Sequence, residues 1–78
     1  MREKQPRFVV TFRTTAEAMA MEKLCREAGV PGRLIPLPRA ISAGCGMCWS
    51  APADSREAVE ELLMASGLLV DGLYDMLL

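Results

Sequence analysis

A capping box followed by an amphipathic segment is the feature that most constrains the fold of this 78-residue chain. Thr14 and Glu17 have the spacing at which each side chain bonds the other residue's backbone N–H, which predicts the start of a helix. Gly29 predicts its end, because glycine readily adopts the left-handed conformation that closes many helices. At about 100° per residue, the apolar residues of this segment share one face. They are Ala18, Met21, Leu24, Cys25 and Ala28.

A second segment, at about residues 55–66, has the same organisation. Asp54 and Glu57 repeat the capping-box spacing, and Gly67 marks the expected end of the helix. Its expected buried stripe consists of Ala58, Val59, Leu62, Leu63 and Ala65. Each predicted helix is therefore apolar along one face and needs a single layer to pack against.

Four short apolar segments supply that layer. Their β-branched and aromatic composition predicts strands at residues 8–12, 33–35, 47–50 and 73–77. The resulting order βαββαβ is that of the ferredoxin-like α+β fold, a two-layer sandwich with both helices on one face of a four-stranded antiparallel sheet. We predict a single domain over residues 1–78, in which residues 1–6 are a flexible leader.

The composition limits the classes of partner. Hydrophobic residues make up 51% of the chain, and the predicted sheet has one face without helices, so we expect a homodimer that covers apolar surface. Aromatic residues are only 5%, too few for a nucleic-acid stacking platform. No apolar run approaches the roughly 20 residues that span a membrane, and the charged N-terminus is unlike a secretory signal. We predict a cytoplasmic protein with reduced thiols.

A glycine-flanked cysteine carries the most distinctive chemistry. Cys45 lies between Gly44 and Gly46, which allow positive φ angles and the close approach of a thiol adduct. Successive backbone N–H groups in such a turn form a concavity that favours a thiolate or persulfide anion. Arg33 and Arg39 precede this turn with no acid nearby in sequence, and would add positive potential. The alternative is a tight turn in which the cysteine is only a small apolar residue.

Cys45 and Cys48 also form a Cys-x-x-Cys motif. Redox enzymes place this motif at a helix N-terminus, whereas here it enters a predicted strand, so a dithiol role and a core role for Cys48 both stay open. A zinc site needs about four ligands, but Cys25 lies on the expected buried helix face and the chain has no histidine. We therefore predict no metal and no histidine-based hydrolase triad. Glycine motifs for nucleotides are also absent, and we predict no cofactor.

Three stretches, residues 12–22, 29–39 and 41–46, resemble a small bacterial and archaeal family described as selenium/sulfur (Se/S) carrier protein-like. The resemblance extends from residue 8 to about residue 76, and Pro-Gly-Arg-Leu-Ile-Pro together with Ser-Ala-Gly-Cys-Gly are its most specific parts. It implies a carrier rather than a turnover enzyme, with sulfur or selenium held on Cys45 as a persulfide or selenopersulfide. Arg33 and Arg39 would be the basic surroundings of Cys45, and donor and acceptor proteins would be the partners.

Cys48 departs from the pattern of this family, in which we expect a small or apolar residue. The resemblance therefore allows Cys48 to be a resolving thiol in this protein alone. Two other functions stay open. One is a homodimeric ferredoxin-like interaction module with incidental thiols, and the other is a dithiol redox protein that uses Cys45 and Cys48.

Overall fold

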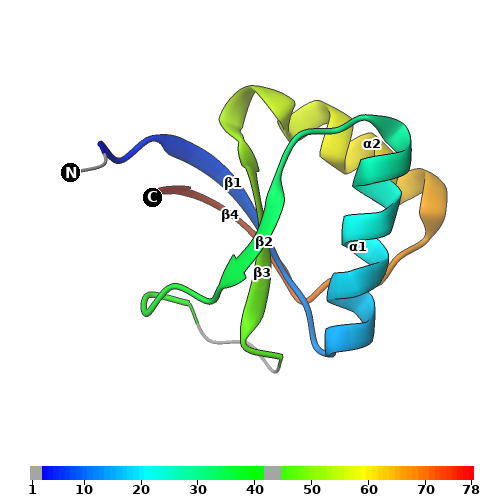
Figure 1. The fold of residues 1–78 in the computed structure, drawn as a ribbon, viewed down its shortest axis with the longest axis horizontal. Helices are drawn as coiled ribbons and strands as arrows, with labels where there is room; N and C mark the ends of the chain where they lie inside the picture. The colour runs from blue at the N-terminus through cyan, green and yellow to red at the C-terminus, as the bar shows by residue number, and fades with distance from the viewer. Residues whose placement is uncertain (1–2, 42–44) are drawn as a thin grey trace.

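The computed structural model describes residues 3–41 and 45–78, and its elements follow the predicted order. They are β1 (Pro6–Thr11), α1 (Thr15–Ala28), β2 (Arg33–Pro36), β3 (Met47–Pro52), the short 3-10 helix η1 (Ala53–Ser55), α2 (Arg56–Ser66) and β4 (Gly72–Leu77). The strands form one antiparallel sheet in the order β2-β3-β1-β4. Both helices lie on the same side of this sheet (Figure 1). The predicted ferredoxin-like α+β fold is therefore confirmed.

Helix α1 begins and ends as its sequence predicts. The Thr14 hydroxyl accepts a hydrogen bond from the Glu17 N–H at 3.3 Å, and the Glu17 carboxylate accepts one from the Thr14 N–H at 3.2 Å. Gly29 closes the helix in the left-handed conformation with φ 72°. A cap of this kind stabilises a helix by about 1 kcal/mol, because it satisfies backbone N–H groups that have no partner within the helix.

The prediction of a second capping box, formed by Asp54 and Glu57, is wrong. Asp54 lies inside η1, and this extra turn makes Ser55 the N-cap of α2, with φ −95° and ψ 5° and no side-chain hydrogen bond to the helix. A side chain caps a helix from extended backbone, a conformation that the preceding turn denies to Ser55. The C-terminal prediction is confirmed, because Gly67 has φ 70° and its N–H donates to the Leu63 carbonyl at 3.1 Å.

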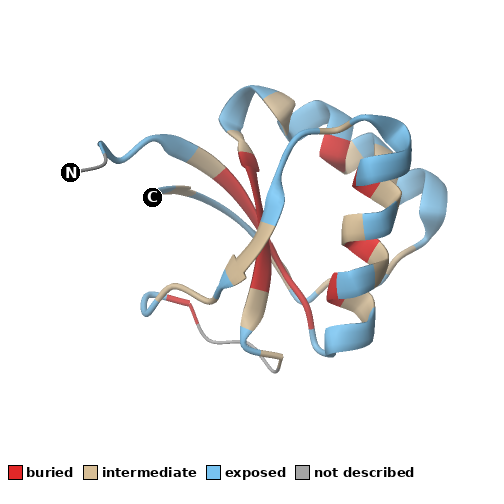
Figure 2. Ribbon diagram, viewed as in Figure 1, coloured by how far each residue is buried: buried red, intermediate tan, exposed pale blue. Residues whose placement is uncertain are grey.

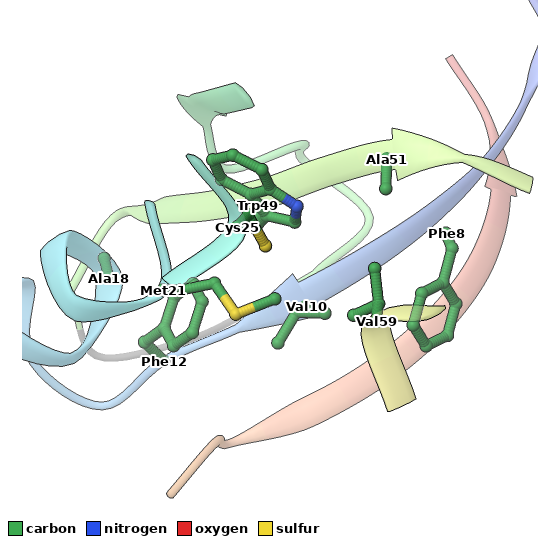
Figure 3. Packing of buried hydrophobic residues seen from close by; sticks show 9 residues of the cluster. All are labelled: Phe8, Val10, Phe12, Ala18, Met21, Cys25, Trp49, Ala51 and Val59. Carbon is green, nitrogen blue, oxygen red and sulfur yellow. The ribbon is translucent and has the colours of Figure 1, made fainter. Parts of the chain in front are cut away.

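The main core lies between the sheet and the two helices. It comprises nine residues that are at most 3% exposed, Phe8, Val10, Phe12, Ala18, Met21, Cys25, Trp49, Ala51 and Val59 (Figure 3). Figure 2 shows the buried positions of both helices turned toward the strands. The core position predicted for Cys25 is confirmed. The predicted helix faces are wider than the observed ones, since Ala28, Ala58 and Ala65 are exposed.

The open face of the sheet carries a second, smaller cluster. Val9, Ile41 and Cys48 are buried there, and Ile35, Leu37, Met76 and Leu78 pack against them. Ile41 comes from the loop between β2 and β3, whose described residues 37–41 extend on the side of the sheet away from the helices (Figure 1). This loop therefore covers apolar surface that the sequence left exposed.

The two ends of the described chain lie side by side (Figure 1). Strand β1 begins at Pro6, two residues before the predicted start, and pairs with Leu77 of β4. Gln5 and Leu78 continue this pairing with two backbone hydrogen bonds of 2.9 and 3.0 Å. Residues 5 and 6, expected in the leader, thus take part in the sheet's pairing. Within the described residues, no helix has the length and apolar character needed to cross a bilayer.

Candidate functional site

The hairpin loop between β2 and β3 holds the predicted site. Its base is closed by a hydrogen bond of 3.0 Å from the Leu37 N–H to the Gly46 carbonyl, next to the paired residues Pro36 and Met47. Arg39 lies in a turn at the start of this loop and Cys45 at its end. Gly44 lies outside the described residues, so its predicted role stays a prediction.

The sulfur of Cys45 contacts the backbone of Met47. Its thiol donates a hydrogen bond to the Met47 carbonyl at 3.2 Å, and its Sγ accepts one from the Met47 N–H at 3.4 Å. Between them, Gly46 has φ 75°, the positive angle that the sequence predicts for a glycine here. A Cβ placed on Gly46 would meet no atom within 4 Å, so open space adjoins the turn.

These two contacts favour different forms of the sulfur. The Met47 carbonyl accepts a hydrogen bond and therefore suits the protonated thiol, whereas the Met47 N–H donates one and suits a sulfur anion. Both groups belong to the backbone and are held by β3, so neither has to be ordered when the sulfur changes state. The turn can thus hold Cys45 as a thiol and also support a thiolate or persulfide.

The three thiols differ in their accessibility. Cys25 and Cys48 are fully buried and unpaired, whereas Cys45 is half-buried and also unpaired. Burial raises the pKa of Cys25 from 9.0 to about 11. Burial also raises the pKa of Cys48 to about 11, with a smaller contribution from the neighbouring Cys45. Since the thiolate is the nucleophile, the two buried thiols are suppressed and Cys45 is the accessible one.

The Cys-x-x-Cys motif is divided between the two clusters. Cys45 packs against the helix-side core, whereas Cys48 belongs to the open-face cluster with Val9 and Ile41. The alternation of side chains along β3 sends Cys48 and Trp49 to opposite faces, whereas Cys45 lies in the turn before β3 begins at Met47. The role of Cys48 as a resolving thiol stays a prediction, and its burial makes it poorly accessible in this conformation.

The two predicted arginines occupy different places. Arg39 is exposed in the same hairpin loop as Cys45. Arg33 begins β2, directly opposite Ser50 of β3, and lines a pocket on the open face. The structure therefore does not bring Arg33 to the turn that holds Cys45. It brings Arg33 into the same pocket as Arg7. No local pattern in the sequence marks Arg7 as a site residue, because only the strand register places it near Arg33.

Trp49 of β3 packs in the helix-side core and lies against the residue that precedes β2. It is only 3% exposed, and its indole lies against Gly32, where an added Cβ would be 2.6 Å from the indole Nε1. Gly32 also has φ 147°, which side chains rarely adopt. The glycine of the Pro-Gly-Arg stretch thus has a physical reason, because it lets β2 begin in contact with Trp49. The structure thus places this tryptophan in the helix-side core.

Over residues 3–41 and 45–78, the cysteine, aspartate and glutamate side chains form no group of three or more that could hold a metal ion. Among the same residues, the hydrogen-bond partners of the Cys45 sulfur are the two backbone atoms of Met47. The described part of the site is thus a thiol in a backbone turn.

Residues 7–75 match the sequence model of the family described as "Putative Se/S carrier protein-like". The chain belongs to this family. The match runs from β1 into β4 and includes the hairpin that holds Cys45. No curated protein and no solved structure matches the chain significantly.

Proposed function

We propose that this protein carries sulfur or selenium on Cys45 as a persulfide or selenopersulfide and passes it to a partner enzyme. The observation that carries the proposal is the accessibility of the thiols: Cys45 alone has exposed surface, and its sulfur already accepts the Met47 N–H. The family's description, which names a carrier of selenium or sulfur, supports the same chemistry.

The loading step is a transfer between two thiols. The Cys45 thiolate attacks the outer sulfur of a cysteine persulfide on a donor protein, so that a new S–S bond forms on Cys45. The S–S bond of the donor breaks, and the donor's cysteine leaves as a thiolate. No net oxidation occurs, because one persulfide and one thiolate are exchanged for another pair. An acceptor nucleophile then takes the outer sulfur by the same exchange and returns Cys45 to its thiolate. With selenium, the transferred atom is the outer selenium.

The backbone turn suits the loaded state. A persulfide is an anion at neutral pH, and the Met47 N–H already points at the sulfur that carries it. Gly46 brings no side chain near the turn, which leaves room for the extra atom and for the partner's nucleophile. Arg39, exposed in the same loop, adds positive potential that attracts the anionic sulfur of a donor.

The partners follow from this chemistry. We propose that donor and acceptor proteins dock at the hairpin loop, where Cys45 reaches the surface, and that the protein works in the reducing cytoplasm, which keeps its three thiols free. Proton transfer in the exchange is left to the partner or to water, since the described hydrogen-bond partners of the sulfur are backbone atoms.

The test is the formation of the adduct on the isolated protein. After incubation with a cysteine desulfurase and cysteine, intact-mass spectrometry should show the gain of one sulfur atom, and selenocysteine as substrate should give the gain of one selenium atom. Cys45→Ser should abolish both gains. Cys25→Ala and Cys48→Ala are matched controls that should retain them, because their thiols are buried. An adduct that persists in Cys45→Ser would refute the proposal.

A homodimeric interaction module is a second candidate function. It is favoured by edge strand β4, whose Leu73, Tyr74 and Leu77 are 43%, 38% and 61% exposed. An uncovered apolar edge strand readily pairs with another strand. Sedimentation at increasing concentration should reveal a dimer that Leu77→Lys disrupts. A monomer at every concentration would exclude the homodimeric module, and a sulfur adduct on Cys45 in the same protein would leave the carrier function as the remaining candidate.

A further inference from the structure

A polar pocket lies on the open face of the sheet, away from the Cys45 turn. Its volume is about 540 Å³, within the range of roughly 300–1,000 Å³ that small-molecule sites occupy. Strands β1, β2 and β3 each contribute to it, together with residues at both ends of the described chain. Its lining includes Lys4, Arg7, Arg33, Ile35, Ser50 and Leu78.

Arg7 is held in place within this pocket. Its Nε donates to the hydroxyl of Ser50 at 2.9 Å, and one of its terminal nitrogens donates to the Ser50 carbonyl at 3.1 Å. Ser50 is only 3% exposed, so the guanidinium is anchored to a rigid part of β3. An arginine that is already ordered loses little conformational freedom when it binds a ligand.

Arg33 of β2 lies across β3 from Arg7 and is paired with the same Ser50. It pairs directly with Ser50 across the β2–β3 ladder, and directly opposed residues in antiparallel strands point to the same face. Ser50 also pairs with Val9, two residues from Arg7 along β1. The two arginines therefore flank Ser50 on one face of the sheet, diagonally across β3.

Cationic side chains outnumber carboxylates among the described residues of the pocket. Lys4 adds a third cation to the lining, against one carboxylate side chain, that of Glu3. Neither Glu3 nor the carboxylate of Leu78 forms an ion pair with these three cations, and the ion pairs of the described residues involve Arg13 and Arg56 instead. Two arginines of one pocket that have no ion-paired carboxylate repel each other, and an anion between them relieves this repulsion.

We propose that this pocket binds a small organic molecule through a phosphate group. Arginine forks match the geometry of phosphate oxygens, and a dianion is neutralised by two guanidinium groups. Ile35 and Leu78 supply apolar walls, which suit an organic body attached to the phosphate. Ile35 also packs in the cluster that contains Ile41 of the hairpin loop, so the bound molecule lies beside the loop that leads to Cys45. This site goes beyond the carrier function and does not depend on it.

Phenyl phosphate is a suitable probe, because it joins a dianion to an apolar body. In a ¹H–¹⁵N NMR titration of the whole chain, it should shift the backbone amides of Arg33, Ile35 and Ser50. Arg33→Gln should weaken binding about tenfold or more, since a hydrogen bond to a charged group contributes about 1.5–3 kcal/mol. Arg33 is exposed and forms no ion pair with any residue of 3–41 or 45–78, so its replacement should leave the fold intact.

The matched control is Arg26→Gln, which removes the same charge from the last turn of α1 and should leave the affinity unchanged. Phenol should not shift the pocket amides, and inorganic phosphate should bind more weakly than phenyl phosphate. Equal affinity in wild type and Arg33→Gln would overturn the proposal. So would equal binding of phenol or of inorganic phosphate, or a glutamate-rich peptide that shifts the same amides at lower concentration. Each readout is independent of the Cys45 adduct, so the two proposals fail separately.

Discussion

The two faces of the sheet differ in what they contribute. The helix-covered face buries nine apolar residues in one continuous core, whereas the open face buries a smaller cluster, centred on Val9, Ile41 and Cys48, beside a cationic pocket. One face thus supplies most of the apolar burial that stabilises the fold, and the other keeps polar groups available. The hairpin loop joins the two, since its Ile41 packs on the open face and its Cys45 packs toward the helix-side core.

The largest expected effect comes from truncating the helix-side core. Phe12 is fully buried, and Phe12→Ala should lower the free energy of unfolding by about 3–5 kcal/mol through lost burial and a residual cavity. Ile41→Ala on the open face should lower it by only about 2 kcal/mol, because Ile41 is 8% exposed and its loop can relax. Urea denaturation measures both values.

The contrast between the faces fails if Ile41→Ala costs as much stability as Phe12→Ala. Should Phe12→Ala be unfolded even without urea, the milder pair Phe12→Leu and Ile41→Val ranks the two clusters in the same way. Cys45 alkylation in the Ile41 variant adds a second readout, because a loosened loop should expose the thiol.

An intermediate effect is expected where β2 meets Trp49. Gly32→Ala places a Cβ within 2.7 Å of the indole and forces a side chain into φ 147°, so it should cost about 1–3 kcal/mol. Gly29→Ala is the matched control, because Gly29 has φ 72° but no atom within 4 Å of an added Cβ. It should cost only the left-handed strain, about 1 kcal/mol. Equal losses in thermal or urea unfolding would show that contact with Trp49 does not matter.

The smallest effect concerns the pH dependence of the two buried thiols, one on each face. The folded-state pKa of Cys25 and of Cys48 is about 11, above the ordinary value of 9.0. Each thiol therefore stabilises the fold fully below pH 9, and this contribution is lost as the pH rises toward 11. From about pH 8 to about pH 10, stability should fall by about 1 kcal/mol for each thiol.

Urea denaturation of Cys25→Ala and Cys48→Ala over the same pH range measures the two contributions separately. Each variant should show a shallower loss of stability than wild type, because other groups that titrate at alkaline pH are common to all three proteins. A pH dependence identical to wild type in both variants would contradict the assignment. A difference between the two variants would show which face excludes solvent better.

Much of the fold follows from local sequence. The Thr14 box, the glycines that end both helices and the β-branched strands act within a few residues of the chain, so their signals survive without tertiary context. The Asp54 box failed because the chain after β3 forms a 3-10 turn that no local spacing shows. The predicted buried faces of the helices were too wide for a related reason. Periodicity identifies the apolar face of a helix, but it does not show how much of that face the sheet covers.

The candidate site divides in the same way. The glycine beside Cys45 predicted the positive φ of the turn, because that requirement is local. The grouping of Arg33 with Arg7 and Ser50 depends on strand register, which couples residues separated by up to 43 positions in the chain. Proximity in the sequence therefore suggested Arg33 as a neighbour of Cys45, but the sheet places Arg33 in the open-face pocket.

The sequence by itself determined the order of helices and strands, the α1 cap and the unusual setting of Cys45, because each depends on neighbouring residues. Only the tertiary structure decided which thiol is accessible, since it buries Cys25 of α1 in the helix-side core and Cys48 in the open-face cluster, while Cys45 keeps some exposed surface. The physical reason is that burial depends on packing between distant segments. Helix α1 turns Cys25 toward the sheet, and side-chain alternation along β3 sends Cys48 to the open face, whereas Cys45 lies in the turn before that strand.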